Sequence, residues 1–361
     1  MSTAAPLRLR GRASACADAP PGARLAPRTV LALGLLALAL AFVAAAASGA
    51  YPIAPGQLLR LLLGGGAGTP EQLVFFHIRL PRLVLAVAAG GGLALAGALM
   101  QGLFRNPLAD PGLVGISSGA ALAAGLVIVL GQHWAPALPH LLGSWTLMLA
   151  AFGGALAVTL LVYLFAQGPL GTHIGLMLLA GVAVNALAGA ALGYLNFIAT
   201  DEQLRNIQFW LLGSLGGARW SAVALVGTLV ALAGMAALAC ARPLNAIALG
   251  EAQAALLGVN VERTKRTAVV TAALAVGAVT ATTGIIGFVG LVAPHWVRLV
   301  AGPDHRVVLP GAALVGGALV LAADALARTA VQPAELPLGV LTAFIGGPMF
   351  LAMLRRFKGR V

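Results

Sequence analysis

The chain has 361 residues, of which 60% are hydrophobic and 9% charged. Soluble domains carry about 25% charged residues, so this composition excludes a soluble globular protein, and the high hydrophobicity excludes a disordered one. Two cysteines, Cys16 and Cys240, exclude a disulfide framework and a four-thiolate metal site. The formal charge of +12 does not indicate a nucleic-acid ligand, because most basic residues stand at the ends of apolar runs, as in membrane proteins.

Ten apolar runs are candidate membrane spans, since a helix needs about 20 residues to cross the hydrocarbon core. They cover residues 29–48, 80–104, 113–131, 145–166, 174–197, 220–241, 267–286, 287–300, 307–328 and 336–354. The run at 287–300 is the shortest, and it holds Pro294, His295 and Arg298. Without it the C-terminus would lie on the opposite side of the membrane.

Residues 1–27 are rich in Ala, Pro and Arg, which predicts a disordered basic cytoplasmic tail. Residues 28–361 are expected to form a single transmembrane domain. The first run also fits a secretory signal, because Arg28 precedes it and small residues end it. The long basic leader and the nine further runs favour a true first span.

The basic residues are distributed unevenly between alternate loops. With the N-terminus inside, 16 of the 22 Lys and Arg residues fall in inner segments and 6 in outer ones. Both termini are therefore expected in the cytoplasm. Small residues on the runs predict close helix packing, as in Gly90–Gly92 with Gly97, Gly115/Gly119, Gly153/Gly154, Gly189/Gly193 and Gly316/Gly317.

No pattern of an enzyme site is visible. Neither lysine, Lys265 or Lys358, lies in a phosphate-binding loop, so any ATP hydrolysis must come from a partner. The six histidines lack metal-ligand spacing, and no clustered acidic site for a membrane-embedded enzyme is present. Asp324 is the one carboxylate inside a strongly predicted span, and it either pairs with Arg328 or relays protons.

The inner segment 249–259 predicts a short helix closed by Gly258. Its apolar stripe consists of Ala252, Ala255, Leu256 and Leu257. The basic residues Arg263, Lys265 and Arg266 follow. Such a helix suits docking of a cytoplasmic protein, and a helix lying on the membrane surface is the alternative.

Three motifs carry a family resemblance. They are Arg-Asn-Pro-Leu-Ala-Asp-Pro-Gly at 105–112, Glu-x-x-Ala-x-x-Leu-Gly-Val at 251–259 and Gly-Phe-Val-Gly-Leu-Val-x-Pro-His at 287–295. From about Arg79 to Arg355 the chain resembles FecCD-type permease subunits of ABC importers for ferric siderophores, hemin or cobalamin. The resemblance implies an all-α protein of the bacterial inner membrane, with ten transmembrane helices, inverted repeats and the type II importer fold.

The resemblance also implies partners and site residues. The subunit would form a homodimer within membrane lipid, carry two cytoplasmic ABC ATPase subunits and receive cargo from a periplasmic binding protein. ATP and Mg²⁺ would belong to the ATPase, with no permanent cofactor or metal here. The ATPase-coupling residues would be Gly250, Glu251, Ala255, Leu257 and Gly258. Arg79, Arg82 and Arg328 would meet the binding protein, although interfacial snorkelling is an alternative for Arg79 and Arg82.

The cargo is indicated more weakly. Residues 194–218 look more like the hemin permeases than the siderophore or cobalamin ones. Hemin is an apolar ring with two propionates, which suits an apolar channel with a basic rim. His77 either ligates heme iron briefly or is an ordinary loop histidine. A ferric-siderophore or cobalamin permease is the alternative within the family, and an ion-driven secondary transporter is the more distant one.

Overall fold

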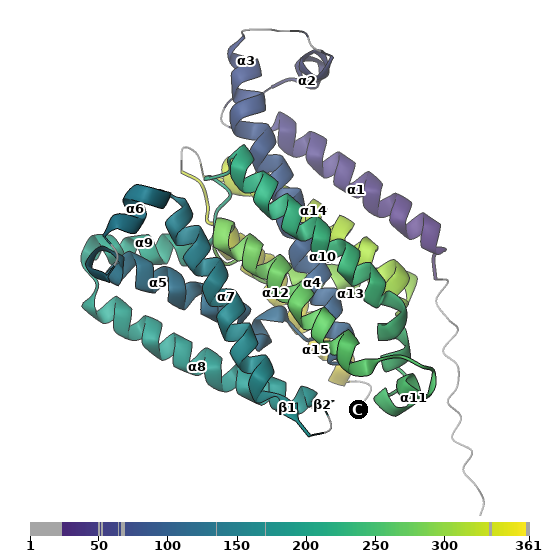
Figure 1. Cartoon of the computed structure of the whole chain (residues 1–361). Helices are drawn as coiled ribbons and strands as arrows, with labels where there is room; N and C mark the ends of the chain where they lie inside the picture. Colours follow the sequence, from purple (N-terminus) through teal and green to yellow (C-terminus); the bar gives the residue numbers. More distant parts are fainter. Residues whose placement is uncertain are drawn as a thin grey trace, which may run out of the picture.

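The computed structural model describes residues 24–49, 51, 53–63, 65, 69–134, 136–169, 171–331 and 334–358. This part of the chain is a helical bundle with one two-stranded hairpin, β1 (Gln167–Gly168) and β2 (Gly171–Thr172) (Figure 1). Residues 1–23, most of the predicted tail, lie outside the described residues. The first helix begins at Pro27, next to the predicted boundary of the tail.

Each of the ten predicted spans is a helix. Seven helical segments are long and apolar enough to cross a membrane, and the three spans at α5, α13 and α15 are shorter apolar helices. The ten helices are α1 (Pro27–Ala47), α4 (Leu80–Leu103), α5 (Ile116–Trp134), α7 (Trp145–Phe165), α8 (Ile174–Ile198), α10 (Trp220–Ile247), α12 (Val261–Thr283), α13 (Val289–Ala301), α14 (His305–Thr329) and α15 (Leu338–Lys358). The short eighth span therefore exists, as α13, at 13 residues.

The second span starts at Leu80 as predicted, but the helix that contains it begins ten residues earlier, at Pro70. α3 (Pro70–Leu73), the π-helical turn η1 (Val74–Arg79) and α4 form one helix of 34 residues. The polar residues Glu71, Gln72 and His77 conceal this extension in the sequence, although Thr69 caps the helix through its hydroxyl. His77 is consequently an exposed helical residue and not a loop residue.

Five further short helices lie between the spans. They are α2 (Pro55–Leu62), the 3-10 turn η2 (Pro111–Val114), α6 (Ala137–Leu142), α9 (Asp201–Leu212) and α11 (Glu251–Leu256). Of these, α9 has a clear sequence signal, because Thr200 and Gln203 form a reciprocal capping box at its start.

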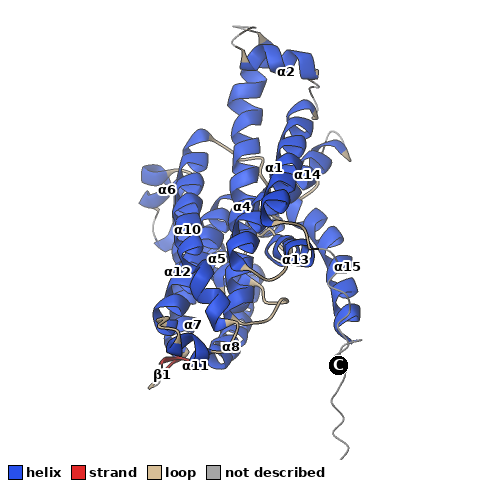
Figure 2. Cartoon of the chain, turned by 90° about the vertical axis from the view of Figure 1, so that its right-hand side faces the viewer, coloured by secondary structure: helices blue, strands red, loops and turns tan. Residues whose placement is uncertain are grey.

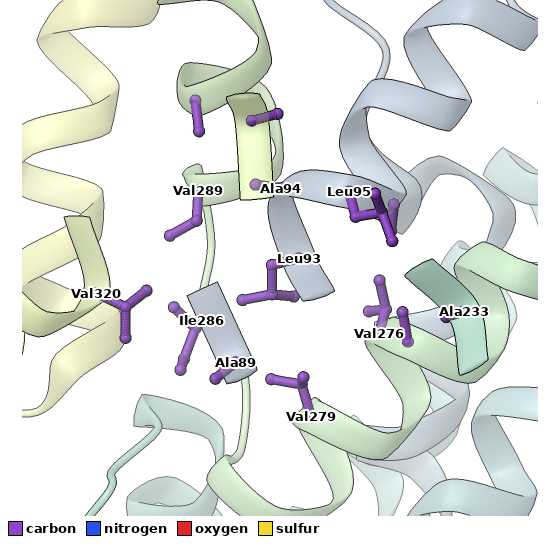
Figure 3. Close-up of a cluster of buried hydrophobic side chains, with 14 of the residues drawn as sticks. Ala89, Leu93, Ala94, Leu95, Ala233, Val276, Val279, Ile286, Val289 and Val320 are labelled. Carbon is purple, nitrogen blue, oxygen red and sulfur yellow. The ribbon is translucent and has the colours of Figure 1, made fainter. Parts of the chain in front are cut away.

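α4 forms the centre of the bundle and packs against α10, α12, α13 and α14. Its small and branched side chains interlock with those of the neighbouring elements (Figure 3), including Ala89, Leu93, Leu95, Ala233, Val276, Val279, Ile286, Val289 and Val320. A second group, α5, α7, α8 and α9, joins this core through α12 (Figure 1). α15 lies at one edge of the bundle (Figure 2).

Glycines allow the closest helix contacts, as the sequence predicts. A Cβ added to Gly90 would overlap the backbone of Gly316, and one added to Gly97 would overlap that of Gly290. These contacts bring α4 against α14 and α13, and Gly119 meets Gly154 in the same way between α5 and α7. Within the chain, Gly153, Gly189 and Gly193 make no such contact, because their added Cβ atoms would meet nothing within 4 Å.

Two glycines of α4 provide a matched test of this packing. Gly97→Ala is expected to destabilise the protein by about 1–3 kcal/mol, because its methyl group must displace a backbone carbonyl. Gly91→Ala is expected to be neutral or slightly stabilising, since its Cβ would be 3.4 Å from the Ala313 carbonyl oxygen and alanine favours helix. Thermal unfolding of both variants in detergent measures the difference, and equal melting temperatures would contradict the packing argument.

Candidate functional site

The functional features lie at the two ends of the bundle and in a cavity between them. α11 and the β1–β2 hairpin lie at one end, and α2, α3 and η1 at the other (Figure 1). The start of α1 belongs to the α11 end, because the Leu25 N–H donates to the Val300 carbonyl at the end of α13 (3.2 Å). The C-terminal end of α15 also lies there (Figures 1 and 2).

α11 has the ends that its sequence predicts. Gly250 precedes it at φ 125°, a conformation that side chains rarely adopt. Gly258 follows it at φ 80°, and its N–H donates to the Ala255 carbonyl (2.9 Å). The Val259 N–H donates to the Ala254 carbonyl (3.0 Å), which closes the helix in the manner of a glycine C-cap.

The apolar side chains of α11 point away from the protein. Leu256 is 88% exposed and Leu257 66% exposed, whereas Ala254 is buried against the bundle. Ala252 and Ala255 are also exposed. The predicted stripe therefore forms an uncovered apolar knob, beyond the C-terminal end of α10.

A buried lysine fixes α11 to the bundle. Lys265 of α12 is 4% exposed, and its ammonium donates to the Glu251 carboxylate (2.7 Å) and to the Thr172 carbonyl (2.8 Å). Glu262, one turn earlier, accepts from the Thr172 N–H (2.9 Å) and from the Tyr163 hydroxyl (3.0 Å). We name this set, Tyr163, Thr172, Glu251, Glu262 and Lys265, the polar lock.

The polar lock corrects the sequence interpretation of Lys265. Lys265 is not a surface anchor beside Arg263 and Arg266, because it is buried and paired. The Glu251 carboxylate turns toward Lys265, and its side chain remains 39% exposed. The sequence gives one usable signal for the lock, since Lys265 is one of only two lysines in the chain.

A second polar connection links the α10 end beside α11 to α14. The Asn245 side chain donates to the Asp304 carboxylate (2.7 Å) and accepts from the His305 backbone N–H (2.9 Å). Asp304 also caps α14 by accepting from the Arg306 N–H (2.9 Å). These contacts connect the C-terminal end of α10, which leads to α11, to the start of α14.

The three arginines predicted for docking lie together at the opposite end, but their guanidinium groups are engaged within the chain. Arg79 is buried and donates to the carbonyls of Ala46 and Tyr51, both at 2.6 Å. Arg328 donates to the carbonyls of Ala45 and Ser48, both at 3.1 Å. Cations are favourable here because the last carbonyls of α1 lack helical partners.

Asp324 lies between two arginines. Its side chain is 1% exposed, and it accepts from Arg328 Nε (2.9 Å) and from Arg82 Nε (2.9 Å). The predicted pairing of Asp324 with Arg328 is therefore confirmed. Arg82 also holds both carboxylate oxygens of Glu335 at 2.9 Å. Because Arg79 and Arg82 bind groups of the protein, their geometry does not support snorkelling.

The hydrogen bonds from Arg82 hold the pKa of the Glu335 carboxyl below its ordinary value of 4.5. A lowered pKa in the folded state contributes stability above the unfolded value, and this contribution is lost as the pH falls through the folded value. We expect wild type to melt above Glu335→Gln at pH 7, with the gap closing below about pH 4.5. A gap that is constant from pH 7 to pH 3 would contradict this account.

The first and third sequence motifs meet at a central cavity of 340 Å³. Asp110 and Gly112 of the η2 segment line one side, and Ile286, Phe288 and Gly290 line the other. The Asp110 carboxylate accepts from the Gly112 N–H (2.7 Å), and burial raises the pKa of this carboxyl. The cavity is otherwise mainly apolar, so it suits a bulky apolar ligand better than a small ion.

Phe288 is the strained residue of this cavity. It adopts φ 65° at the N-terminal end of α13, and its ring occupies the space that a side chain at Gly346 of α15 would need. Such strain persists only where surrounding packing enforces it. In the sequence, the motif at 287–295 is the only feature that distinguishes this segment. Among the described residues, no group of three or more His, Cys, Asp or Glu side chains is arranged to hold a metal ion.

Comparisons with known proteins identify relatives over most of the chain. Residues 36–356 match the model of the FecCD transport family. The hemin transport system permease protein HmuU of Yersinia pestis is 44% identical over 333 residues, which are 92% of this chain and 97% of that protein. The cobalamin import system permease protein BtuC of Halobacterium salinarum is 42% identical over 291 residues, or 80% and 75% of the two chains.

The fold has a relative among solved structures. One structure, described as an inward-facing conformation of a metal-chelate type ABC transporter, superimposes with a TM-score of 0.80 and 30% identity. The match covers 91% of this chain and 99% of that one. The all-helical permease fold that the resemblance implies is confirmed. On its sequence and its fold, this multi-pass membrane protein belongs to the FecCD transport family.

Proposed function

We propose that the protein is the permease subunit of an ATP-driven importer that moves hemin from the periplasm to the cytoplasm. The observation that carries the proposal is the exposed apolar knob of α11, held on a buried polar lock. A rigid, uncovered knob suits a separate motor protein, and the chain has no phosphate-binding loop of its own.

The orientation follows from charge. The α11 end, where the described ends of α1 and α15 also lie, carries most of the basic residues, so it is the cytoplasmic end under the positive-inside rule. In the inner membrane of a bacterium, α11 would then face a cytoplasmic ATPase. α2, α3 and η1 would face the periplasm and its binding protein.

In the proposed mechanism the permease contributes no bond-making chemistry. ATP and Mg²⁺ bind the partner ATPases, whose closure displaces α11. The polar lock and the Asn245–Asp304 contact transmit this displacement to α12 and α14, which pack on the central helix α4. Tilting of these helices in a homodimer would open the central cavity to one side at a time.

Hemin is proposed as the cargo because HmuU is a hemin permease by name and matches over nearly its full length. The mainly apolar lining of the central cavity suits a porphyrin face. Cobalamin is the second candidate, since several relatives at 39–42% identity are named as cobalamin or vitamin B12 permeases. No residue of the cavity is specific to either cargo.

We also propose that Arg79, Arg82 and Arg328 dock the binding protein, although all three already bind groups of this chain. Their hydrogen bonds to α1, Asp324 and Glu335 give them a role in stabilising the fold. Arg82 keeps the best access to a partner, because Glu335, to which it is bound, is 46% exposed on its side chain. A partner carboxylate would therefore have to compete with Glu335.

Reconstitution tests the function directly. In proteoliposomes that contain the permease, its ATPase and its binding protein, we expect hemin to stimulate ATP hydrolysis and vanadate to stop hemin uptake. Stimulation by cobalamin or by a ferric hydroxamate siderophore, without stimulation by hemin, would overturn the cargo. Uptake that survives vanadate but stops with an ionophore would overturn the ATP-driven mechanism and favour Asp324 as a proton relay.

A further inference from the structure

An apolar groove with a volume of 720 Å³ lies on the side of the bundle. α1 and α10 form its walls, and α4 and α14 form its floor. Figure 1 shows α1 and α10 on either side of α14. Glycines keep it open, since a Cβ added at Gly227 or Gly234 would meet nothing within 4 Å. We call this cavity the lateral groove.

The lateral groove is about as long as one leaflet of a membrane is thick. On α10 it runs from Gly227 to Leu238, about 16 Å at the helical rise per residue. This length is about half of a hydrocarbon core about 30 Å thick. On α1 and α14 the groove begins at Leu31 and Pro310, near the start of each helix at the α11 end, so it runs from that end toward the middle of the bundle.

At the α11 end, three arginines lie on the same helix faces as the residues that line the groove. Arg28 precedes Leu31 by three residues on α1, Arg242 follows Leu238 by four on α10, and Arg306 precedes Pro310 by four on α14. Residues three or four apart share a helix face, so each arginine lies one turn beyond the groove. All three are exposed.

The positive charge of these arginines is largely uncompensated within the described part of the chain. Arg306 pairs with Asp304 at the surface, and neither Arg28 nor Arg242 has an ion pair among the described residues. Three cations above an apolar slot of one-leaflet length complement an anionic head group above an acyl chain. No acidic residue lines the groove, so the groove itself supplies no counter-charge to these arginines.

We propose that the lateral groove binds one anionic phospholipid, with an acyl chain between α1 and α10 and the phosphate on Arg28, Arg242 and Arg306. The site is distinct from the central cavity, and it does not depend on the identity of the cargo. Basic pockets between transmembrane helices bind anionic lipid head groups by the same combination of forces. Bound lipid would fix α1 against the core helices.

Native mass spectrometry of the delipidated full chain tests the site, with phosphatidylglycerol and phosphatidylethanolamine of identical acyl chains as probes. We expect wild type to prefer phosphatidylglycerol by at least about tenfold, since each arginine contributes about a factor of five. The triple variant Arg28→Gln, Arg242→Gln, Arg306→Gln should lose this preference. The control variant Arg263→Gln, Arg266→Gln, Arg355→Gln removes the same charge at the same end and should keep it.

A second set of substitutions tests the shape of the groove without changing any charge. Gly227→Leu with Gly234→Leu, at positions where an added Cβ meets nothing within 4 Å, fills the groove and should lower binding of both lipids. Ala37→Leu, on the opposite flank of α1, should leave both unchanged. The proposal is overturned if wild type shows no lipid preference, if the control triple variant loses it equally, or if the filled groove binds lipid as wild type does.

Discussion

Replacing Lys265 by methionine is expected to reduce cargo uptake more than tenfold while the ATPase subunits continue to hydrolyse ATP. Methionine keeps the buried aliphatic stem of Lys265 but removes the ammonium that joins Glu251 to the Thr172 carbonyl. α11 would then lose its fixed attachment to α12 and to the hairpin between α7 and α8. The ATPase subunits would then move α11 without moving the bundle, so ATP hydrolysis would be uncoupled from transport.

The stability cost of this substitution is expected to be moderate. The Thr172 carbonyl loses one buried partner, which costs about 1–3 kcal/mol. Glu251 recovers hydration, because its side chain is 39% exposed. The variant should therefore fold, which size-exclusion chromatography and thermal unfolding in detergent verify before uptake and ATPase rates are compared in proteoliposomes.

Arg266→Met is the matched control, since Arg266 is the next residue on α12 and is exposed. It should retain uptake near the wild-type rate. Glu251→Gln should resemble Lys265→Met, and the double variant should be no worse than either, because both remove the same contact. Normal coupled transport by Lys265→Met would show that the polar lock is not needed for coupling.

Asp324→Asn should lower the free energy of unfolding by about 3–5 kcal/mol, the usual cost of removing one partner of a buried ion pair. Asp324 is 1% exposed and neutralises both Arg82 and Arg328, which are themselves largely buried. The asparagine fits the same space, so the loss would be electrostatic and would not reflect a cavity. The end of α1 should loosen first, since Arg328 also holds the carbonyls of Ala45 and Ser48.

Glu335→Gln provides the comparison, because Glu335 binds the same Arg82 but is 46% exposed on its side chain. An exposed ion pair contributes about 0–1 kcal/mol, so at pH 7 this variant should melt only slightly below wild type. Denaturation of both variants in the same detergent measures the contrast. Equal losses would mean that burial does not govern this network, and wild-type stability of Asp324→Asn would remove its structural role.

Much of the architecture is visible in the sequence because the membrane imposes a simple rule. A backbone in hydrocarbon must satisfy its own hydrogen bonds, so long apolar runs become helices and their charged flanks set the orientation. The ten runs correspond to ten helices, and Gly250 and Gly258 bound α11 as local backbone chemistry requires. The helical extension before the second span is missed because its polar residues resemble a loop.

The site residues were harder to predict, since their roles depend on partners distant in the chain. Arg79 and Arg82 read as free outer cations, yet they bind α1, Asp324 and Glu335. Lys265 reads as a surface anchor beside two exposed arginines, yet it is the centre of the polar lock. Exposure and pairing are properties of packing, and helical periodicity alone does not determine which face of a uniformly apolar helix is covered.

The sequence by itself determined the membrane class, the positions of the long apolar helices, the family and the short helix α11, because each rests on local composition or on contiguous motifs. The tertiary structure alone decided which charges are buried in pairs, which glycines bring backbones into contact and where the lateral groove lies. The physical reason is that long-range contacts fix the dielectric surroundings of a charge and the space beside a helix. Neither quantity is encoded within a single run of residues.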